Sequence, residues 1–140
     1  TVEDLVNADL PYAPPFSLAI DHFIATAHLM QNKMKGRLKG ISCHQVHLKI
    51  LAGEKPFLID ARGPEEFEEM RLGIGETLIP LGAIRKRLKE LPEDKNKEII
   101  CYCKISLRGY EAALALEGNG WKNVKVMEGG IMAWPYPREK

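Results

Sequence analysis

One stretch decides the fold of this chain: Glu98-Ile-Ile-Cys-Tyr-Cys-Lys-Ile-Ser-Leu-Arg-Gly-Tyr-Glu-Ala-Ala-Leu-Ala-Leu116. It begins with a short apolar run, residues 99–103, flanked by charged residues, and this pattern predicts a buried strand. It continues as an Ala- and Leu-rich segment with apolar residues at helical spacing, which predicts a helix closed by Gly118. A strand followed at once by a helix indicates an α/β fold with a parallel sheet.

Cys103 ends the predicted strand, and Arg108 follows it after four residues. Open α/β sheets bind ligands at the carboxyl ends of their strands. The free N–H groups and positive end of the next helix stabilise an anion, so they favour the thiolate of Cys103 over the thiol. Lys104 and Arg108 add positive charge nearby. We therefore predict a partly exposed, nucleophilic cysteine in a cradle for an anionic sulfur species; the alternative is a structural cysteine before an ordinary helix.

The loop Cys103-Lys-Ile-Ser-Leu-Arg108-Gly-Tyr110 resembles the active-site loop of the rhodanese-homology sulfurtransferases, in which four residues separate the cysteine and the arginine. Three other segments resemble further motifs of this family in order and spacing. They are residues 58–67, where a strand ends in Asp-x-Arg, residues 79–81, a strand containing a proline, and residues 120–134, the closing signature. The resemblance covers residues 41 to 137.

The resemblance implies roles for individual residues. Cys103 would be the catalytic nucleophile, and the loop that binds sulfur or an anion would consist of Lys104, Ile105, Ser106, Leu107 and Arg108. Asp60 and Arg62 would support this loop as a structural ion pair or cap. Ser106 and Lys104 are the positions expected to set the preference for the sulfur donor. Related phosphatases and arsenate reductases have five residues between cysteine and arginine, so the loop length favours sulfur transfer over phosphate chemistry.

The expected chemistry follows from the nucleophile. The Cys103 thiolate attacks a sulfane sulfur donor, such as thiosulfate, a polysulfide or a persulfide, and carries the sulfur as a persulfide until a thiol acceptor removes it. Arg108 closes the loop or meets an anionic donor. This chemistry requires no metal and no dissociable cofactor. The alternative in another class is a non-catalytic docking or regulatory module of a larger oxidoreductase.

Residues 1–40 do not resemble a rhodanese. They contain a proline-rich string, Pro11-Tyr12-Ala13-Pro14-Pro15-Phe16-Ser17, and continue with a predicted helix over residues 22–34, capped by Ser17 or Asp21, and a basic linker. This arrangement is similar to the dimerisation-domain tail of FAD-dependent pyridine nucleotide-disulfide oxidoreductases. Coenzyme A disulfide reductases and persulfide reductases, some with a C-terminal rhodanese, are the most similar members. The resemblance makes Tyr12 a candidate for a tyrosine that reaches across the dimer; the alternative is a hydrophobic anchor.

The glycine motifs that bind FAD and nicotinamide are absent from this chain. FAD, NAD(P)H and coenzyme A are therefore expected only for a parent protein, in which a flavoprotein reductase is fused to this sequence. We predict a helical appendage over residues 1–40. We predict a three-layer α/β rhodanese-like domain over residues 41–140, with a mostly parallel sheet of about five strands flanked by helices.

Within this domain, the sequence pattern predicts strands at residues 41–42, 57–59, 79–81, 99–103 and 124–127, the third at a sheet edge where a proline is tolerated. Helices are predicted at residues 44–52, from Pro64, at 84–91 as an amphipathic basic helix, and before Trp134. The sequence departs from the family at Leu72, where relatives often have histidine, and at Glu76, where they have alanine. We expect these two differences to affect the packing of that loop and not the nucleophile.

The charge balance, 20 basic and 19 acidic residues, gives no overall field that would recruit nucleic acid or a membrane. No apolar run approaches the roughly 20 residues of a spanning helix, and the first residues lack a signal-peptide pattern. The three cysteines are not spaced like a disulfide framework, so we expect a reducing, cytoplasmic setting.

Two groups of side chains have alternative interpretations. One interpretation of Cys43, His44 and His47 is a metal site, but no fourth ligand is evident nearby. We expect these side chains to be surface residues on a helix instead. Cys101 lies two residues before Cys103 in the strand, and we expect it to be buried and apolar. A resolving thiol is the alternative role for Cys101, although a disulfide between the two would be strained.

Overall fold

The computed structural model describes residues 1–11, 15 and 20–140, which divide into two units, Thr1–Leu38 and Lys39–Lys140. The first unit contains α1 (Val2–Val6) and α2 (His22–Met34). Asp21 caps α2 by accepting a hydrogen bond from the Phe23 N–H at 2.8 Å, so the predicted helix is confirmed. The sequence analysis missed α1, which a capping box between Thr1 and Asp4 supports. Tyr12 lies outside the described residues.

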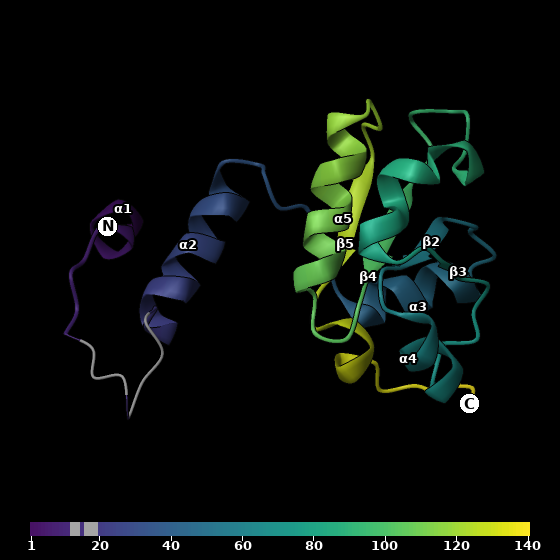
Figure 1. Cartoon of the computed structure of the whole chain (residues 1–140), viewed down its shortest axis with the longest axis horizontal. Helices are drawn as coiled ribbons and strands as arrows, with labels where there is room; N and C mark the ends of the chain where they lie inside the picture. The colour runs from purple at the N-terminus through teal and green to yellow at the C-terminus, as the bar shows by residue number, and fades with distance from the viewer. Residues whose placement is uncertain (12–14, 16–19) are drawn as a thin grey trace. The chain divides into compact units, whose positions relative to one another are not determined.

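A parallel sheet of five strands organises the second unit, in the order β1-β5-β4-β2-β3 (Figure 1). The strands are β1 (Gly40–Ile41), β2 (Phe57–Asp60), β3 (Thr77–Leu78), β4 (Ile99–Tyr102) and β5 (Val124–Met127). Every neighbouring pair is parallel, and in the central pairs Leu58 lies opposite Ile100 and Ile100 opposite Lys125. The predicted mostly parallel sheet is confirmed, and β4, which leads to Cys103, occupies its centre.

Helices cover both faces of this sheet. They are α3 (Cys43–Leu51), α4 (Pro64–Glu69), α5 (Leu107–Gly118) and the 3₁₀ helices η1 (Leu81–Lys86), η2 (Leu88–Glu90) and η3 (Gly130–Ala133). On one face, α5 packs against β4, β5 and η1. On the other face, Val46 of α3, Ile131 of η3 and Trp134 form one buried cluster with Ile100 and Tyr102 of β4. Two apolar cores on either side of a buried sheet give the predicted three layers.

Two element predictions next to the sheet edge are wrong. The edge strand is Thr77–Leu78 rather than residues 79–81, because Pro80 has no N–H and Leu81 already begins η1. The helix predicted over residues 84–91 is instead split into η1 and η2. The Arg87 N–H donates to the carbonyls of both Ala83 and Ile84, and η1 ends at this point. Pro80 and Pro92 leave only a short segment between them for a helix.

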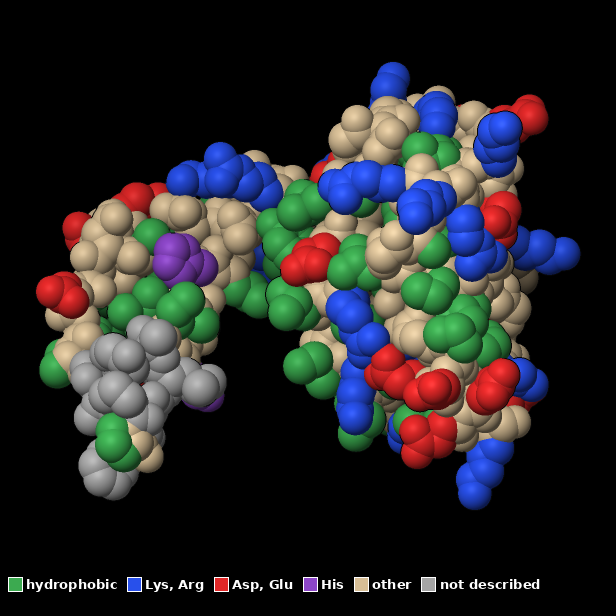
Figure 2. Space-filling view, in the orientation of Figure 1, with side chains coloured by type: hydrophobic (Ala, Val, Ile, Leu, Met, Phe, Trp, Pro, Cys, Tyr) green, Lys and Arg blue, Asp and Glu red, His purple; other side chains and the backbone are tan. Residues whose placement is uncertain are grey.

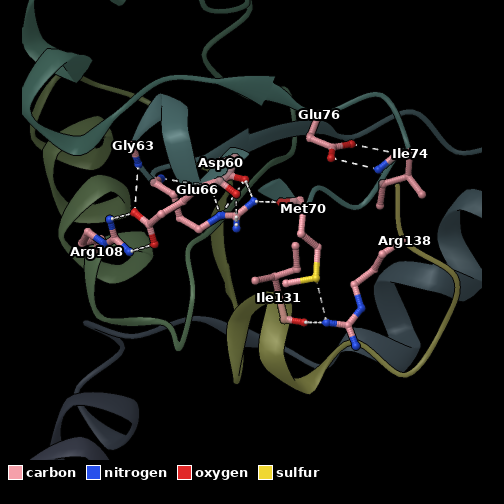
Figure 3. A network of polar contacts seen from close by, with 11 residues as sticks. Asp60, Gly63, Glu66, Met70, Ile74, Glu76, Arg108, Ile131 and Arg138 are labelled. Carbon is pink, nitrogen blue, oxygen red and sulfur yellow. Dashed lines mark hydrogen bonds and ion pairs between the residues drawn. The ribbon is translucent and has the colours of Figure 1, made fainter. Parts of the chain in front are cut away.

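The loop at Leu72 and Glu76 folds without the residues that relatives often have there. Leu72 is buried in the core. The Glu76 carboxylate accepts hydrogen bonds from the Gly73 and Ile74 N–H groups, both at 2.9 Å (Figure 3). The longer acidic side chain thus stabilises the turn by satisfying two backbone donors.

The C-terminal segment closes the domain. Tyr136 stacks on His47 with ring centroids 3.6 Å apart, and the Tyr136 hydroxyl hydrogen-bonds His44 Nδ1 at 2.5 Å. Arg71 and Glu139 form an antiparallel bridge and an ion pair at 3.0 Å. His44 and His47 therefore hold the C-terminal segment against α3, and within the described ranges no three His, Cys, Asp or Glu side chains gather as metal ligands would.

Charge is mixed over the visible face of this unit, where acidic side chains gather over the region of α4 and basic ones are spread elsewhere (Figure 2). This distribution agrees with a formal net charge of +1. Across the described residues, no helix has both the length and the apolar composition needed to cross a membrane.

Candidate active site

Cys103 follows directly after β4, at the carboxyl edge of the sheet, and the loop of residues 103–108 leads from it into α5. Its Sγ accepts a hydrogen bond from the Ser106 N–H at 3.2 Å. The residue is only 1% exposed, less than predicted, because the loop folds over the sulfur. Ile105 and Leu107, by contrast, are 67% and 64% exposed, so the loop turns apolar side chains outward and its sulfur inward.

The 3₁₀ helix η3 holds the backbone of this loop through hydrogen bonds. The Ile131 N–H donates to the Cys103 carbonyl at 2.9 Å, and the Met132 N–H to the Lys104 carbonyl at 3.2 Å. At Gly130, with a φ of +58°, a Cβ atom would lie 2.3 Å from the Cys103 carbonyl oxygen. Only glycine fits between η3 and the loop at this position. The start of η3 therefore packs directly against the backbone of Cys103.

Arg108 closes the loop through an ion pair with Glu66 of α4. Its two terminal nitrogens donate to the two Glu66 carboxylate oxygens at 2.6 and 2.7 Å (Figure 3). The hydrogen bonds from Arg108 lower the pKa of Glu66 to about 2, and the same pairing raises the pKa of Arg108. Arg108 thus joins the loop to α4 through Glu66, and its alternative role toward an anionic donor stays a prediction.

Asp60 and Arg62 form a buried pair beside this bridge. The Arg62 Nη2 lies 2.7 Å from the Asp60 Oδ2, and the side chains are 3% and 0% exposed. Arg62 also donates to the carbonyls of Glu66 and Met70 at 3.0 and 2.7 Å, which ties β2 to the middle and to the C-terminal end of α4 (Figure 3). The pair thus supports the helix that carries Glu66, and Glu66 in turn holds Arg108.

The other two cysteines are free thiols in the core. Cys101 has no exposed surface, and burial raises the pKa of its thiol well above the usual range. Cys43 lies on the other face, where its Sγ donates to the Glu128 carbonyl at 3.4 Å and burial again raises its pKa. A thiol kept protonated is a poor nucleophile, so neither Cys43 nor Cys101 is suited to carry sulfur.

Glu66 was not predicted from the sequence as the partner of Arg108. The contact follows from the strand order, because β2 and β4 are neighbours in the parallel sheet. The helices that follow the two strands then begin at the same sheet edge. The first turn of α4 and the first turn of α5 lie close together for this reason.

The comparisons with known proteins agree with this architecture. The sequence model of the rhodanese-like domain matches residues 44–135. The putative sulfurtransferase YtwF of Bacillus subtilis is 36% identical over 102 residues, which cover 69% of this chain and 90% of that protein. The chain belongs to the rhodanese-like domain family.

Two solved structures resemble a larger part of the chain. One is the reduced CoADR-RHD of Bacillus anthracis, with a TM-score of 0.85 and 34% identity. The other is an NAD-dependent persulfide reductase from A. fulgidus, with a TM-score of 0.79 and 36% identity. The similarity covers 96% and 97% of this chain but only 23% of each of those chains, so the sequence spans about a quarter of their length.

Proposed function

We propose that this chain is a sulfurtransferase domain that carries sulfane sulfur as a persulfide on Cys103. The observation that carries the proposal is the surroundings of Cys103: a cysteine at the end of the central strand, with a backbone N–H 3.2 Å from its sulfur and a loop closed by Arg108. Backbone donors of this kind stabilise a sulfur anion.

The proposed reaction has two balanced steps. The Cys103 thiolate attacks the outer sulfur of thiosulfate, the sulfur–sulfur bond of the donor breaks, and sulfite leaves with the electron pair of that bond. A thiolate acceptor then attacks the outer sulfur of the Cys103 persulfide, and the Cys103 thiolate leaves. No net oxidation occurs, because one sulfur–sulfur bond is exchanged for another in each step.

We further propose that this domain is the C-terminal module of a flavin-dependent NAD(P)H disulfide or persulfide reductase of the coenzyme A type. Support comes from the coverage of 96% and 97% by the two reductase structures. The unit of residues 39–140 accounts for only 102 of the 140 residues, so these similarities extend into residues 1–38. The fused reductase would bind FAD, NAD(P)H and coenzyme A. We also propose that the whole protein is cytoplasmic.

Steady-state sulfur transfer tests the proposal. With thiosulfate as donor and cyanide as acceptor, we expect the wild-type chain and Cys101→Ser to form thiocyanate at similar rates, and Cys103→Ser to form none. If Cys103→Ser were as active as the wild type, another group would carry the sulfur. If the wild type were inactive with thiosulfate, polysulfide and persulfide donors, the docking role would replace catalysis.

A further inference from the structure

Ser106 has an unusual backbone conformation. Its φ is +106°, and no other non-glycine residue within the described ranges has a positive φ. An L-amino acid other than glycine adopts this region at an energetic cost, so it persists there only where its surroundings hold it. Such positions concentrate at functional sites. Ser106 lies between Cys103 and Arg108, in the middle of the active-site loop.

The side chain of Ser106 stabilises this backbone conformation through two hydrogen bonds. Its Oγ accepts a hydrogen bond from the Gly129 N–H at 2.7 Å and donates to the Met127 carbonyl at 3.3 Å. Ser106 is also the N-cap residue of α5, where a serine hydroxyl ordinarily accepts a bond from the first turn of the helix. Here the hydroxyl makes no such cap bond. It joins the loop to the end of β5 instead.

The backbone of Ser106 contacts the sulfur of Cys103. With its side chain fixed on the β5 turn, Ser106 directs its N–H at Cys103 Sγ, 3.2 Å away. The 3₁₀ helix η3, which follows this turn, holds the Cys103 carbonyl through the Ile131 N–H. The hydroxyl of Ser106 thus adds a side-chain link to the backbone hydrogen bond that joins η3 to the loop.

We propose that Ser106 is a positioning residue: its hydroxyl locks the loop onto the turn at Met127–Gly129, so that its own N–H stabilises the anionic sulfur of Cys103. The inference rests on the proposed function, since Cys103 is the sulfur carrier there. This role differs from the preference for a sulfur donor that the sequence predicted for Ser106. The Ser106 hydroxyl donates one hydrogen bond and accepts another within the protein, so it is not directed at a bound sulfur donor.

The test uses the full chain with Ser106→Gly and Ser106→Ala. Glycine adopts the positive φ without strain but lacks the hydroxyl, and alanine lacks the hydroxyl and keeps the strain. Thr26→Ala is the control, because it removes a hydroxyl that donates to the His22 carbonyl within α2, in the unit that does not contain the loop. The readout is the pH dependence of Cys103 alkylation by iodoacetamide, followed on the Cys103 peptide by mass spectrometry.

We expect both Ser106 variants to move the half-maximal pH of alkylation upward by about 0.5 to 1 unit, which corresponds to the loss of one hydrogen bond to the thiolate. Thr26→Ala should leave the profile unchanged. In steady-state sulfur transfer, the Ser106 variants should lose about fivefold to tenfold in kcat with an unchanged KM for thiosulfate. A profile for Ser106→Gly that coincides with the wild type would overturn the proposal, as would a raised KM with an unchanged kcat.

The two proposals fail in different ways. If the wild type accepts no sulfur from any donor, the proposed function fails, but the alkylation profiles still decide whether Ser106 positions Cys103. If the wild type turns over and Ser106→Gly matches it in both alkylation and kcat, the positioning role fails and the sulfurtransferase function stands.

Discussion

At the scale of single residues, the environment of Cys103 depends on groups that do not react. Glu66 holds Arg108, and Gly130 leaves space for the carbonyl of Cys103 itself. Neither is a nucleophile, and neither would be found by a search for reactive side chains. Each nevertheless has a measurable energetic role that a single substitution exposes.

Glu66→Gln should destabilise the domain at neutral pH and leave its stability almost unchanged near pH 2. The pKa of Glu66 is lowered from 4.5 to about 2 in the folded state, so its ion pair contributes above pH 4.5 and is lost as the pH falls toward 2. Both side chains are about one-third exposed, and solvent screening limits the contribution to about 1 kcal/mol. Urea unfolding at pH 7 and pH 2 measures it, with exposed Glu65→Gln as the control. An equal loss at both pH values would contradict the assignment.

Gly130→Ala should cost about 2 kcal/mol or more, because the added Cβ would lie 2.3 Å from the Cys103 carbonyl oxygen and 2.6 Å from that of Lys104. The carbonyls belong to the backbone and cannot move without displacing the loop. Thermal unfolding measures the loss. Gly82→Ala is the matched control, because a Cβ there meets no atom within 4 Å. Equal melting temperatures for the two variants would show that the loop does not depend on this close approach.

At the scale of elements, the buried pair of Asp60 and Arg62 joins β2 to α4 and so places Glu66. Arg62→Ala should cost about 3 to 5 kcal/mol, since it leaves the Asp60 carboxylate buried without its partner. Arg71→Ala, which breaks the exposed ion pair with Glu139, should cost under about 1 kcal/mol. Equilibrium unfolding of both variants gives the comparison. Similar losses would mean that burial does not separate the two ion pairs energetically.

Sequence reasoning predicted the central elements best, because β4 and α5 combine a short apolar run with a long Ala- and Leu-rich helix. It was weakest between Pro80 and Pro92, where a helical pattern is too short to form an α-helix and folds as η1 and η2. In the site, the positions of Cys103 and Arg108 on one loop followed from their spacing. The hydrogen bonds of Ser106 and the partner of Arg108 depend on tertiary contacts that spacing along the chain does not contain.

At the scale of the whole molecule, the chain divides into two units, with the boundary in the sequence between Leu38 and Lys39. Lys39 belongs to the second unit, because its carbonyl accepts the Val126 N–H at 2.8 Å and its ammonium group pairs with Glu117 at 2.7 Å. We expect residues 39–140 to fold alone, since the sheet and both cores lie within them. Deletion of residues 1–38 should leave the cooperative unfolding transition and the alkylation rate of Cys103 unchanged. A non-cooperative transition would show that the second unit needs the first.

The central claim is that Cys103 carries sulfur, and intact-mass spectrometry after treatment with thiosulfate or polysulfide tests it most directly. We predict that the wild type and Cys101→Ser each gain one sulfur atom, that Cys103→Ser gains none, and that cyanide removes the adduct. The thiols of Cys43 and Cys101, whose pKa values are raised by burial, serve as internal controls in every sample. A wild-type chain that stays unmodified with every donor, or a Cys103→Ser variant that still gains sulfur, would contradict the account.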